Sequence, residues 1–433
     1  MKIAFFTPLY PVKSGISHYS EVLLHFLQNY LDIDVFIDDY EPLEKPRGKL
    51  GIYSFRDFEK RLKSEEYALQ IYQMGNNSYH FYMYPFIIQY PGIVVMHDFV
   101  LHHSFAGMTV VEGDRKRYIE EMRYDYGETG VMIAEMRFRN IFTELQQFVY
   151  PLNKRIIDSG VGIIVHNEYA RKKILEYNPA KDVKKINMGI LPPEDMSANK
   201  RDLKRKLGIP DNNFVIGVFG FVNAIKRVNI LIEAFKTLRK EYPDIFLLIV
   251  GEIAPQTGIV EKITEYSLES SVKIAGFVPE DDFSKYILAS DVAVNLRYPT
   301  AGETSASMLR IMSMGVPVVL SNYRQFAEMP DNCCIKIDLG KNEISDLHNA
   351  LKGLLSNKTM RKEIGENAAA YISKDYSPEG AAKAYFDFID SIYRKRKVLR
   401  KILNEAMGDE EWITLSQGDL YFKKAASELG IVL

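Results

Sequence analysis

The stretch VAVNLRYPTAGETSASMLRIMSMGVPVVLSN, residues 292–322, contains in order an apolar strand, a loop, a helix and a second apolar strand. Both strands are short and uniformly apolar, which is typical of parallel strands that are covered on both faces. The loop carries Gly-Glu-Thr-Ser directly before the helix, where Thr304 or Ser305 can cap its amino end. This unit predicts an α/β fold with a functional loop at the carboxyl end of a strand.

The same alternation of strand and helix extends in both directions along the 433-residue chain. Two successive blocks of such units predict two doubly wound, Rossmann-like domains, with the cleft between them as the expected ligand site. The other expected strands cover residues 2–7, 68–73, 92–96, 161–165, 214–220, 245–250 and 272–275.

Domain limits follow from breaks in this alternation. Residues 108–158 have helical periodicity without strand signals, so we expect a helical insertion in an N-terminal domain over 1–190. The prolines and glycine of GILPPEDMSA, residues 189–198, indicate a linker. A C-terminal domain over 198–375 and a helical extension over 376–433 complete the predicted organisation.

Composition limits the possible partners and the compartment. A formal net charge of −2 gives no basic excess of the kind that nucleic-acid binding requires, so no nucleic acid is expected. The first apolar run is too short for a signal peptide or a membrane span, and we expect a cytoplasmic protein. The basic and apolar segment YRKRKVLRKIL, residues 393–403, suits peripheral contact with the inner membrane face or a helix packed on the N-terminal domain; we favour packing.

Two candidate site residues follow predicted strands of the N-terminal domain. Gly15 lies in the first strand-to-helix loop, where glycine permits close approach of a phosphate to a helix amino end. His97 follows the strand 92–96, and its neutral imidazole could bond a substrate hydroxyl, with Asp98 orienting the ring. His102 and His103 invite a metal interpretation, but no carboxylate or cysteine stands at a familiar ligand spacing, so no metal is expected.

The C-terminal domain offers cations and hydroxyls at two strand ends. Lys226 and Arg227 follow the strand 214–220, where a point charge can meet a phosphate. Glu303 stands at the mouth of the second loop and could accept hydrogen bonds from sugar hydroxyls. The alternative is that these residues form a solvated basic pair and a capped helix with an acidic first turn.

Taken together, SGISHYS, HD after a strand, GFVNAIKR, VKIAGFVPEDDFSKYILASDVAVN and GETSASMLRIMSMGVPVVLSN resemble the retaining glycosyltransferases of family 4, which have the GT-B fold. The resemblance covers roughly residues 1–385. It implies a nucleotide diphosphate sugar as donor, UDP- or GDP-linked, bound to the C-terminal domain. It also implies an acceptor on the N-terminal domain, either a glycan, a lipid-linked glycan or a small molecule. Neither a cofactor nor a metal is implied.

The resemblance also implies roles for individual residues. Gly15 would lie near the diphosphate and the sugar, and His97 would match the active-site histidine that contacts the donor sugar. Lys226 would match the phosphate-binding lysine, with Arg227 as a second cation. The segment Gly276, Phe277 and Val278 would present its backbone to the nucleobase.

Two positions depart from the family pattern. Phe221 stands where the family has an arginine, five residues before the lysine. The paired glutamates are replaced by Gly302 and Arg310 when the sequences are aligned on MGVPVV, and Glu303 could substitute for the first. Arginine cannot accept hydrogen bonds from ribose hydroxyls, but it could bond a phosphate, so we interpret the change as a variant site.

The resulting hypothesis is an enzyme that transfers a glycosyl unit with retention of anomeric configuration. A sugar nucleotide 2-epimerase would have a similar fold, but it would require more acidic and histidine residues along the cleft. A noncatalytic partner subunit or nucleotide-sugar binding protein fits the missing glutamates, whereas the presence of His97, Lys226 and Glu303 argues for catalysis.

Overall fold

The computed structural model describes residues 1–12, 14–42, 48–191 and 198–407. The chain divides into two compact units, which we consider separately. The first contains Met1–Gly189, the short segment Ala301–Thr304 and the helix that begins at Pro378; the second contains Ile190–Thr300 and Ser305–Ser377. Most of the linker predicted at 189–198, and the end of the predicted extension from residue 408, lie outside the described residues.

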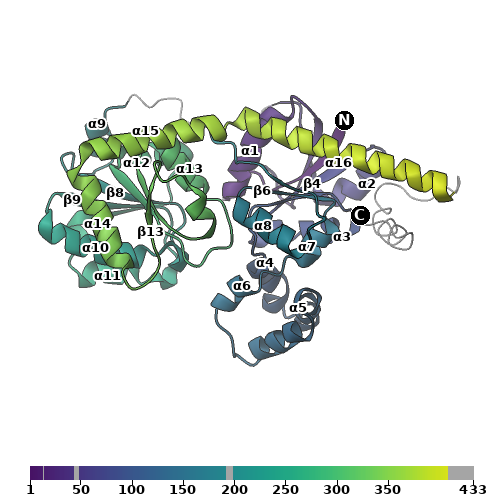
Figure 1. Cartoon of the computed structure of the whole chain (residues 1–433), viewed down its shortest axis with the longest axis horizontal. Coiled ribbons are helices and arrows are strands. Elements are labelled where there is room, and N and C mark those ends of the chain that lie inside the picture. The colour runs from purple at the N-terminus through teal and green to yellow at the C-terminus, as the bar shows by residue number, and fades with distance from the viewer. Residues whose placement is uncertain (13, 43–47, 192–197, 408–433) are drawn as a thin grey trace. The chain divides into compact units, whose positions relative to one another are not determined.

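The first unit is built on a seven-stranded parallel sheet of order β3-β2-β1-β4-β5-β6-β7 (Figure 1). Its strands are β1 (Lys2–Phe6), β2 (Asp32–Ile37), β3 (Gly51–Ser54), β4 (Leu69–Met74), β5 (Ile93–Met96), β6 (Gly162–Val165) and β7 (Val183–Lys185). Its helices are α1 (Gly15–Leu27), α2 (Phe58–Leu62), α3 (Met83–Gln89), α4 (His102–Ala106), α5 (Arg115–Phe138), α6 (Leu145–Val149), α7 (Lys154–Ser159), α8 (Glu168–Tyr177) and α16 (Pro378–Met407).

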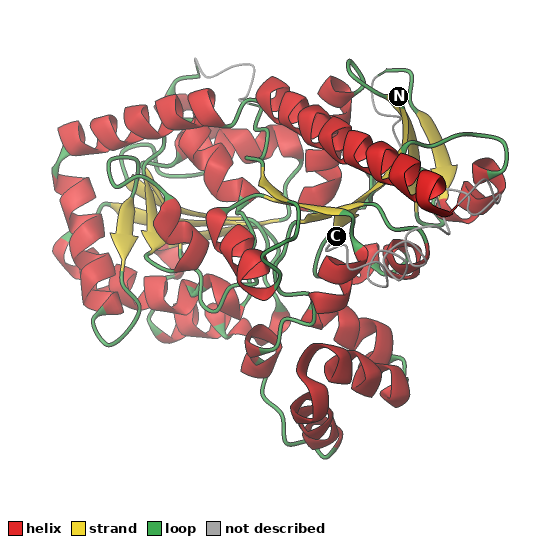
Figure 2. Cartoon of the chain, turned by 45° about the vertical axis from the view of Figure 1, so that its right-hand side comes forward, coloured by secondary structure: helices red, strands yellow, loops and turns green. Residues whose placement is uncertain are grey.

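The second unit is built on a six-stranded parallel sheet of order β10-β9-β8-β11-β12-β13. Its strands are β8 (Phe214–Phe219), β9 (Ile245–Val250), β10 (Val272–Gly276), β11 (Val292–Asn295), β12 (Val318–Ser321) and β13 (Ile335–Ile337). Its helices are α9 (Lys200–Lys206), α10 (Val228–Glu241), α11 (Ile259–Glu265), α12 (Glu280–Ala289), α13 (Ala306–Ser313), α14 (Glu343–Ser356) and α15 (Lys358–Asp375). Helices cover the strands of both units, as Figure 2 shows, so the predicted α/β architecture is confirmed.

Local sequence explains the layers. All six side chains of β9, IFLLIV, are buried, as expected for a strand covered on both faces. Helix α10 buries Val228, Leu231, Phe235 and Leu238 at three- and four-residue spacing and so presents one apolar side to the core.

Each sheet has a point where the strand order reverses, between β1 and β4 and between β8 and β11. Loops at the carboxyl ends of these strands are the favoured ligand positions of doubly wound sheets.

The apolar pattern located the central strands but missed four others. Strands β2, β3, β7 and β13 were not predicted. The first begins with DID, and the other three are only three or four residues long and lie at or near sheet edges. Short edge strands bury less apolar surface, so their sequence signal is weak.

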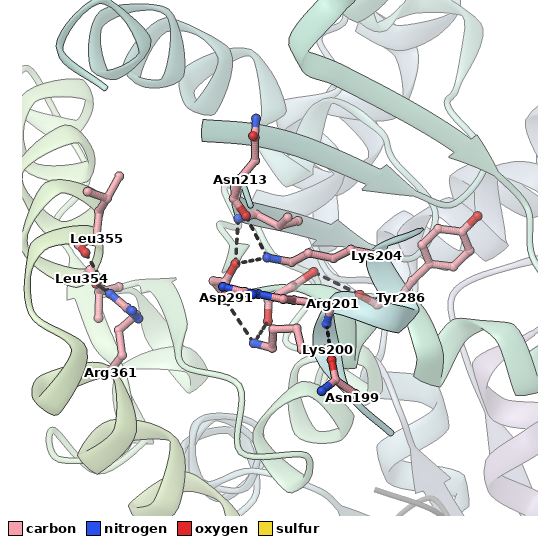
Figure 3. Close-up of polar contacts among 12 residues, drawn as sticks. Asn199, Lys200, Arg201, Lys204, Asn213, Tyr286, Asp291, Leu354, Leu355 and Arg361 are labelled. Atoms are coloured by element: carbon pink, nitrogen blue, oxygen red, sulfur yellow. Dashed lines mark hydrogen bonds and ion pairs between the residues drawn. The ribbon is translucent and has the colours of Figure 1, made fainter. Parts of the chain in front are cut away.

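A network of charges fixes helix α9 to the second sheet (Figure 3). The carboxylate of Asp291, just before β11, lies 2.8 Å from Nζ of Lys204 and 3.1 Å from Nζ of Lys200, and it accepts the backbone N–H of Val215 at 2.9 Å. Burial alone would raise the pKa of Asp291, but Lys200 and Lys204 outweigh burial and the pKa is lowered. This network lies at the amino ends of β8 and β11, whereas ligands of doubly wound sheets bind at the carboxyl ends. We therefore assign it a structural role.

Candidate functional site

In the second unit, Lys226 lies over the end of the central strand β8. Its side chain is only 8% exposed, and its ammonium group donates to the carbonyl of Phe219. Gly220 follows with a φ of +83°, and a Cβ there would come within 2.9 Å of Lys226 Nζ and 3.8 Å of Ser307 Oγ. A side chain at position 220 would therefore occupy the space in which the ammonium group and this hydroxyl meet.

The amino end of helix α13 adds further donors. Ser305 caps the helix, accepting the backbone N–H of Met308 at 3.3 Å, and its hydroxyl lies 3.2 Å from that of Ser307. A helix amino end carries partial positive charge and unpaired N–H groups. The structure thus brings the predicted Lys226 and Ser305, together with Ser307, close to the amino end of α13 at the reversal point between β8 and β11. Binding of a diphosphate at this position stays a prediction.

Arg227 has a different environment from its neighbour. Its Nε donates to Glu343 Oε1 at 2.7 Å, a second guanidinium nitrogen donates to the other carboxylate oxygen, and the Glu343 side chain is 3% exposed. The guanidinium also faces the Tyr298 ring at 5.6 Å. The predicted contact of Arg227 with the donor diphosphate stays a prediction, but the structure gives this side chain a structural partner.

Arg310 lies against helix α12. Its guanidinium carbon is 4.6 Å from the centre of the Phe283 ring, and one of its nitrogens donates to Ser284 Oγ at 3.3 Å. Phe283 in turn meets Phe219, the last residue of β8, edge to face. Arg310 therefore lies within a cluster next to the strand that leads to Lys226.

The predicted nucleobase segment follows strand β10. Gly276 has a φ of +68°, and its carbonyl accepts the backbone N–H of Gly251 at 2.8 Å. Phe277 is 61% exposed, Val278 is half-buried, and Phe221 beyond β8 is also exposed. Two aromatic rings therefore reach solvent just beyond the carboxyl ends of β8 and β10.

In the first unit, Gly15 begins helix α1. The helix is capped by Ser14, whose hydroxyl accepts the backbone N–H of Ile16 at 3.2 Å. A Cβ built on Gly15 would meet no atom within 4 Å. A Cβ at this position would therefore fit without a clash, and the close approach of a ligand to Gly15 stays a prediction.

His97 lies directly after β5 and is buried. Its Nε2 is 2.7 Å from Gln73 Oε1, and its ring contacts those of Tyr19, edge-on at 5.1 Å, and His166, at 4.8 Å. Burial, and secondarily His166, lowers its pKa well below the usual value. The ring is therefore neutral at pH 7. With the Gln73 amide oxygen facing the ring, Nε2 is assigned the proton, because an amide oxygen can only accept, and Nδ1 is the acceptor nitrogen.

The expectation that Asp98 orients His97 is wrong, because Gln73 provides the ring's hydrogen-bond partner. Asp98 Oδ2 instead accepts the backbone N–H of Asn76 at 2.8 Å. Burial, and then the charge of Glu303, raises the pKa of Asp98 to about 7. The charge of Glu303 thus acts on the protonation of Asp98 close to neutral pH.

Glu303 is held in the first unit by its neighbours in the segment 301–304. Asn167 donates to the Gly302 carbonyl at 2.9 Å and to Thr304 Oγ1 at 3.2 Å, and Val100 N–H donates to the Ala301 carbonyl at 2.8 Å. Gly302 has a φ of +79°, and a Cβ there would lie 2.7 Å from Phe99 Cβ. Only glycine fits this turn.

The first unit also shows which residues sequence reasoning missed. Gln73 is the penultimate residue of β4, and Asn167 caps the helix after β6. A polar residue at the carboxyl end of a predicted parallel strand was the available signal for both.

His102, for which the sequence raised a metal interpretation, is hydrogen-bonded to the Tyr150 carbonyl and the Tyr118 hydroxyl. Among the described ranges, no group of three or more His, Cys, Asp or Glu residues is arranged to hold a metal ion.

Four buried histidines and the half-buried His103 lie in the first unit. Burial lowers the pKa of all five: to about 4 for His80, His103 and His166, to about 3 for His102 and by a large amount for His97. Burial shifts the pKa of two carboxyls in the opposite direction, Asp98 to about 7 and Asp125 to about 6. The second unit contains a single histidine, His348.

We expect the first unit to lose stability first in mild acid. Below pH 6.5 these histidines are protonated in the unfolded chain but stay neutral in the folded unit. As the pH falls below 6.5, each of them therefore lowers the free energy of unfolding by about 1.4 kcal/mol per pH unit, until its folded-state pKa is reached. Above pH 6.5 this loss is absent. Asp98 and Asp125 oppose this, but the histidines outnumber them. Hydrogen exchange at pH 7 and pH 5, corrected for intrinsic rates, should show β4, β5 and β6 losing more protection than β8, β9 and β11. Equal losses would contradict this assignment.

Comparison with solved structures identifies the fold. Two parallel Rossmann-like units are the architecture called GT-B, and solved structures share this fold over most of the chain. WaaG, a glycosyltransferase of lipopolysaccharide biosynthesis, has a TM-score of 0.61 at 16% identity, covering 88% of this chain and 99% of WaaG. Anabaena HepE, solved with UDP, has a TM-score of 0.63 at 17% identity, covering 90% and 100%. Sucrose-phosphate synthase of Thermosynechococcus elongatus has a TM-score of 0.62 at 15% identity, covering 92% and 99%.

Sequence comparison finds a family match within the second unit. Residues 199–371 match the family described as Glycosyl transferases group 1. An uncharacterized glycosyltransferase of Methanocaldococcus jannaschii is 26% identical over 37% of this chain and 41% of its own length. Alpha-monoglucosyldiacylglycerol synthase of Acholeplasma laidlawii is 25% identical over 72% and 86%. D-inositol 3-phosphate glycosyltransferase of Corynebacterium kroppenstedtii is 23% identical over 56% of each chain. The match thus spans less than two thirds of the first and third relatives.

Proposed function

We propose that this protein is a retaining glycosyltransferase that moves a hexosyl unit from a UDP- or GDP-linked sugar to a hydroxyl group of a glycan, a lipid-linked glycan or a small molecule. The observation that carries the proposal is the meeting of Lys226, Gly220 and Ser307 at the amino end of α13. A preformed group of donors stabilises the negative charge that develops on a leaving diphosphate. The names of the relatives, and the UDP and UDP-glucose in the HepE structures, support this choice of donor.

The proposed reaction needs no covalent enzyme intermediate. The acceptor oxygen forms its bond to the anomeric carbon on the face from which the phosphate oxygen departs, and the departing phosphate oxygen takes the acceptor proton. Lys226 and the α13 amino end neutralise the diphosphate in place of a metal ion. His97, neutral with Nδ1 as acceptor, is assigned to the donor sugar, and Glu303 to the sugar hydroxyls.

A second candidate is a nucleotide-sugar binding protein without catalysis. It is favoured by Gly302 and Arg310, which occupy the aligned positions of the paired glutamates. Arg310 has no acceptor for ribose hydroxyls and lies against Phe283 and Ser284. This candidate predicts nucleotide binding without turnover.

The test is a thermal-shift panel of UDP, GDP, ADP and CMP with their common sugar conjugates at millimolar concentration, without added metal. We expect one nucleoside diphosphate to raise the melting temperature, because a ligand that binds only the folded state stabilises it by mass action. The shift should disappear in Lys226→Ala and persist in Lys240→Ala, an exposed lysine on α10.

Product analysis then separates the two candidates. Binding followed by sugar transfer with retained configuration, measured by NMR of the product anomer, would support the enzyme. Binding with no release of nucleotide from any conjugate would favour the noncatalytic candidate. No shift with any nucleotide would overturn both.

A further inference from the structure

The last described turns of helix α16 present an exposed side that combines cations with apolar groups. We name this side the basic–apolar face and define it by Arg394, Lys395, Lys397, Val398, Lys401 and Ile402, all of them exposed. Val398 is 58% exposed and Ile402 is 47% exposed. Because these two residues are four apart, their side chains lie one above the other on a helix.

The earlier part of the same helix is buried. Tyr385, Ile389 and Ile392 are at most 2% exposed, and the Tyr385 hydroxyl accepts a hydrogen bond from Tyr19 of α1 at 2.8 Å. Packing on the first unit continues in part beyond these residues, because Tyr393, Arg396 and Leu399 are half-buried and Lys395 pairs with Asp182. Beyond Ile392, burial gives way to the basic–apolar face, at the yellow end of α16 in Figure 1.

Charge is concentrated at this end of the helix. Residues 393–403 contain six Lys or Arg residues and no Asp or Glu, although the whole chain has a formal net charge of −2. Arg394 Nε lies 2.9 Å from Asp390, and Lys395 Nζ lies 2.5 Å from Asp182. The segment 393–403 itself carries six formal positive charges.

We propose that the basic–apolar face binds an anionic lipid surface, with Val398 and Ile402 entering the headgroup region and the surrounding cations meeting lipid phosphates. Clusters of four to eight basic residues on an amphipathic helix suit such a surface. A second copy of the same face is disfavoured, because cations would then face cations. Among the described residues, no helix has the length and hydropathy that a membrane-spanning segment needs. Because α16 would meet the lipid through one side of the helix, the contact that we propose is parallel to the surface.

Co-sedimentation of the full chain with lipid vesicles tests the proposal. We expect binding to vesicles of phosphatidylcholine with 30% phosphatidylglycerol, little binding to pure phosphatidylcholine, and weaker binding at 0.5 M NaCl, where charges are screened. Each basic residue near an anionic surface contributes about fivefold to partitioning, so Lys397→Glu with Lys401→Glu should reduce it at least about 25-fold. Lys358→Glu with Lys362→Glu on α15 changes the net charge equally and should leave binding intact.

A second pair of variants tests the apolar part. Val398→Ser with Ile402→Ser keeps every charge and should reduce partitioning about tenfold. Thermal unfolding and light scattering of each variant without lipid establish that fold and oligomeric state are unchanged. The proposal is overturned if the charge reversal leaves binding unchanged, if neutral vesicles bind equally well, or if the reversal dissociates an oligomer, since the face would then be a protein interface.

Discussion

Replacing Lys226 by alanine should lower the rate of sugar transfer about 100-fold, which corresponds to roughly 3 kcal/mol for one preorganised donor to a developing charge. The reason is position: the ammonium group is almost buried, lies over Gly220 and is next to Ser307 at the amino end of α13. In such a site water cannot replace the lost charge. Release of nucleoside diphosphate from the donor identified by thermal shift measures the effect.

Lys226→Met is the more informative variant, because it keeps most of the side-chain volume and removes only the charge. It should lose as much activity as Lys226→Ala while unfolding at nearly the wild-type temperature. Lys240→Ala is the control for loss of a lysine in the same unit. Near-normal turnover in Lys226→Met would refute the diphosphate role, whatever the alanine variant does.

Replacing Arg227 by alanine should chiefly destabilise the second unit. Glu343 would keep a charge in a buried position without its cation, and breaking a buried pair in this way costs about 3–5 kcal/mol in the free energy of unfolding. Denaturant unfolding measures the loss. Arg227→Ala combined with Glu343→Gln should recover part of it, because the orphaned carboxylate is then neutral.

The same variants decide whether Arg227 also serves the donor. If the guanidinium only supports the fold, the double variant should bind the nucleotide with nearly wild-type affinity. A large loss of affinity together with a small loss of stability would reverse this assignment and make Arg227 a second phosphate-binding cation.

The sequence predicted the parts of the fold and site that depend on local pattern. Uniformly apolar runs located the central strands, and position at a strand end singled out His97 and Lys226. Contacts between distant residues had no local signal. Arg227 and Glu343 are 116 residues apart, and Gln73 meets His97 only because β4 and β5 pair in the register Gln73 with Val95.

The segment 301–304 is the clearest case of this limit. Its sequence indicated a loop before a helix, and nothing in the sequence indicated that Ala301, Gly302 and Thr304 bond to Val100 and Asn167 of the first unit. Strand and helix periodicity describes how a segment folds on itself. Which unit it packs against depends on tertiary structure.

The path of the chain between the two units limits which segments can be exchanged by recombination. The polypeptide passes from one unit to the other after Gly189, Thr300, Thr304 and Ser377, so neither unit is a single continuous stretch of gene. A recombination event that exchanged residues 198–375 with a relative would bring four foreign residues into the host's first unit, where position 302 must fit beside Phe99 and position 304 must accept from Asn167. Chimeric proteins built from this chain should therefore retain its own Ala301–Thr304.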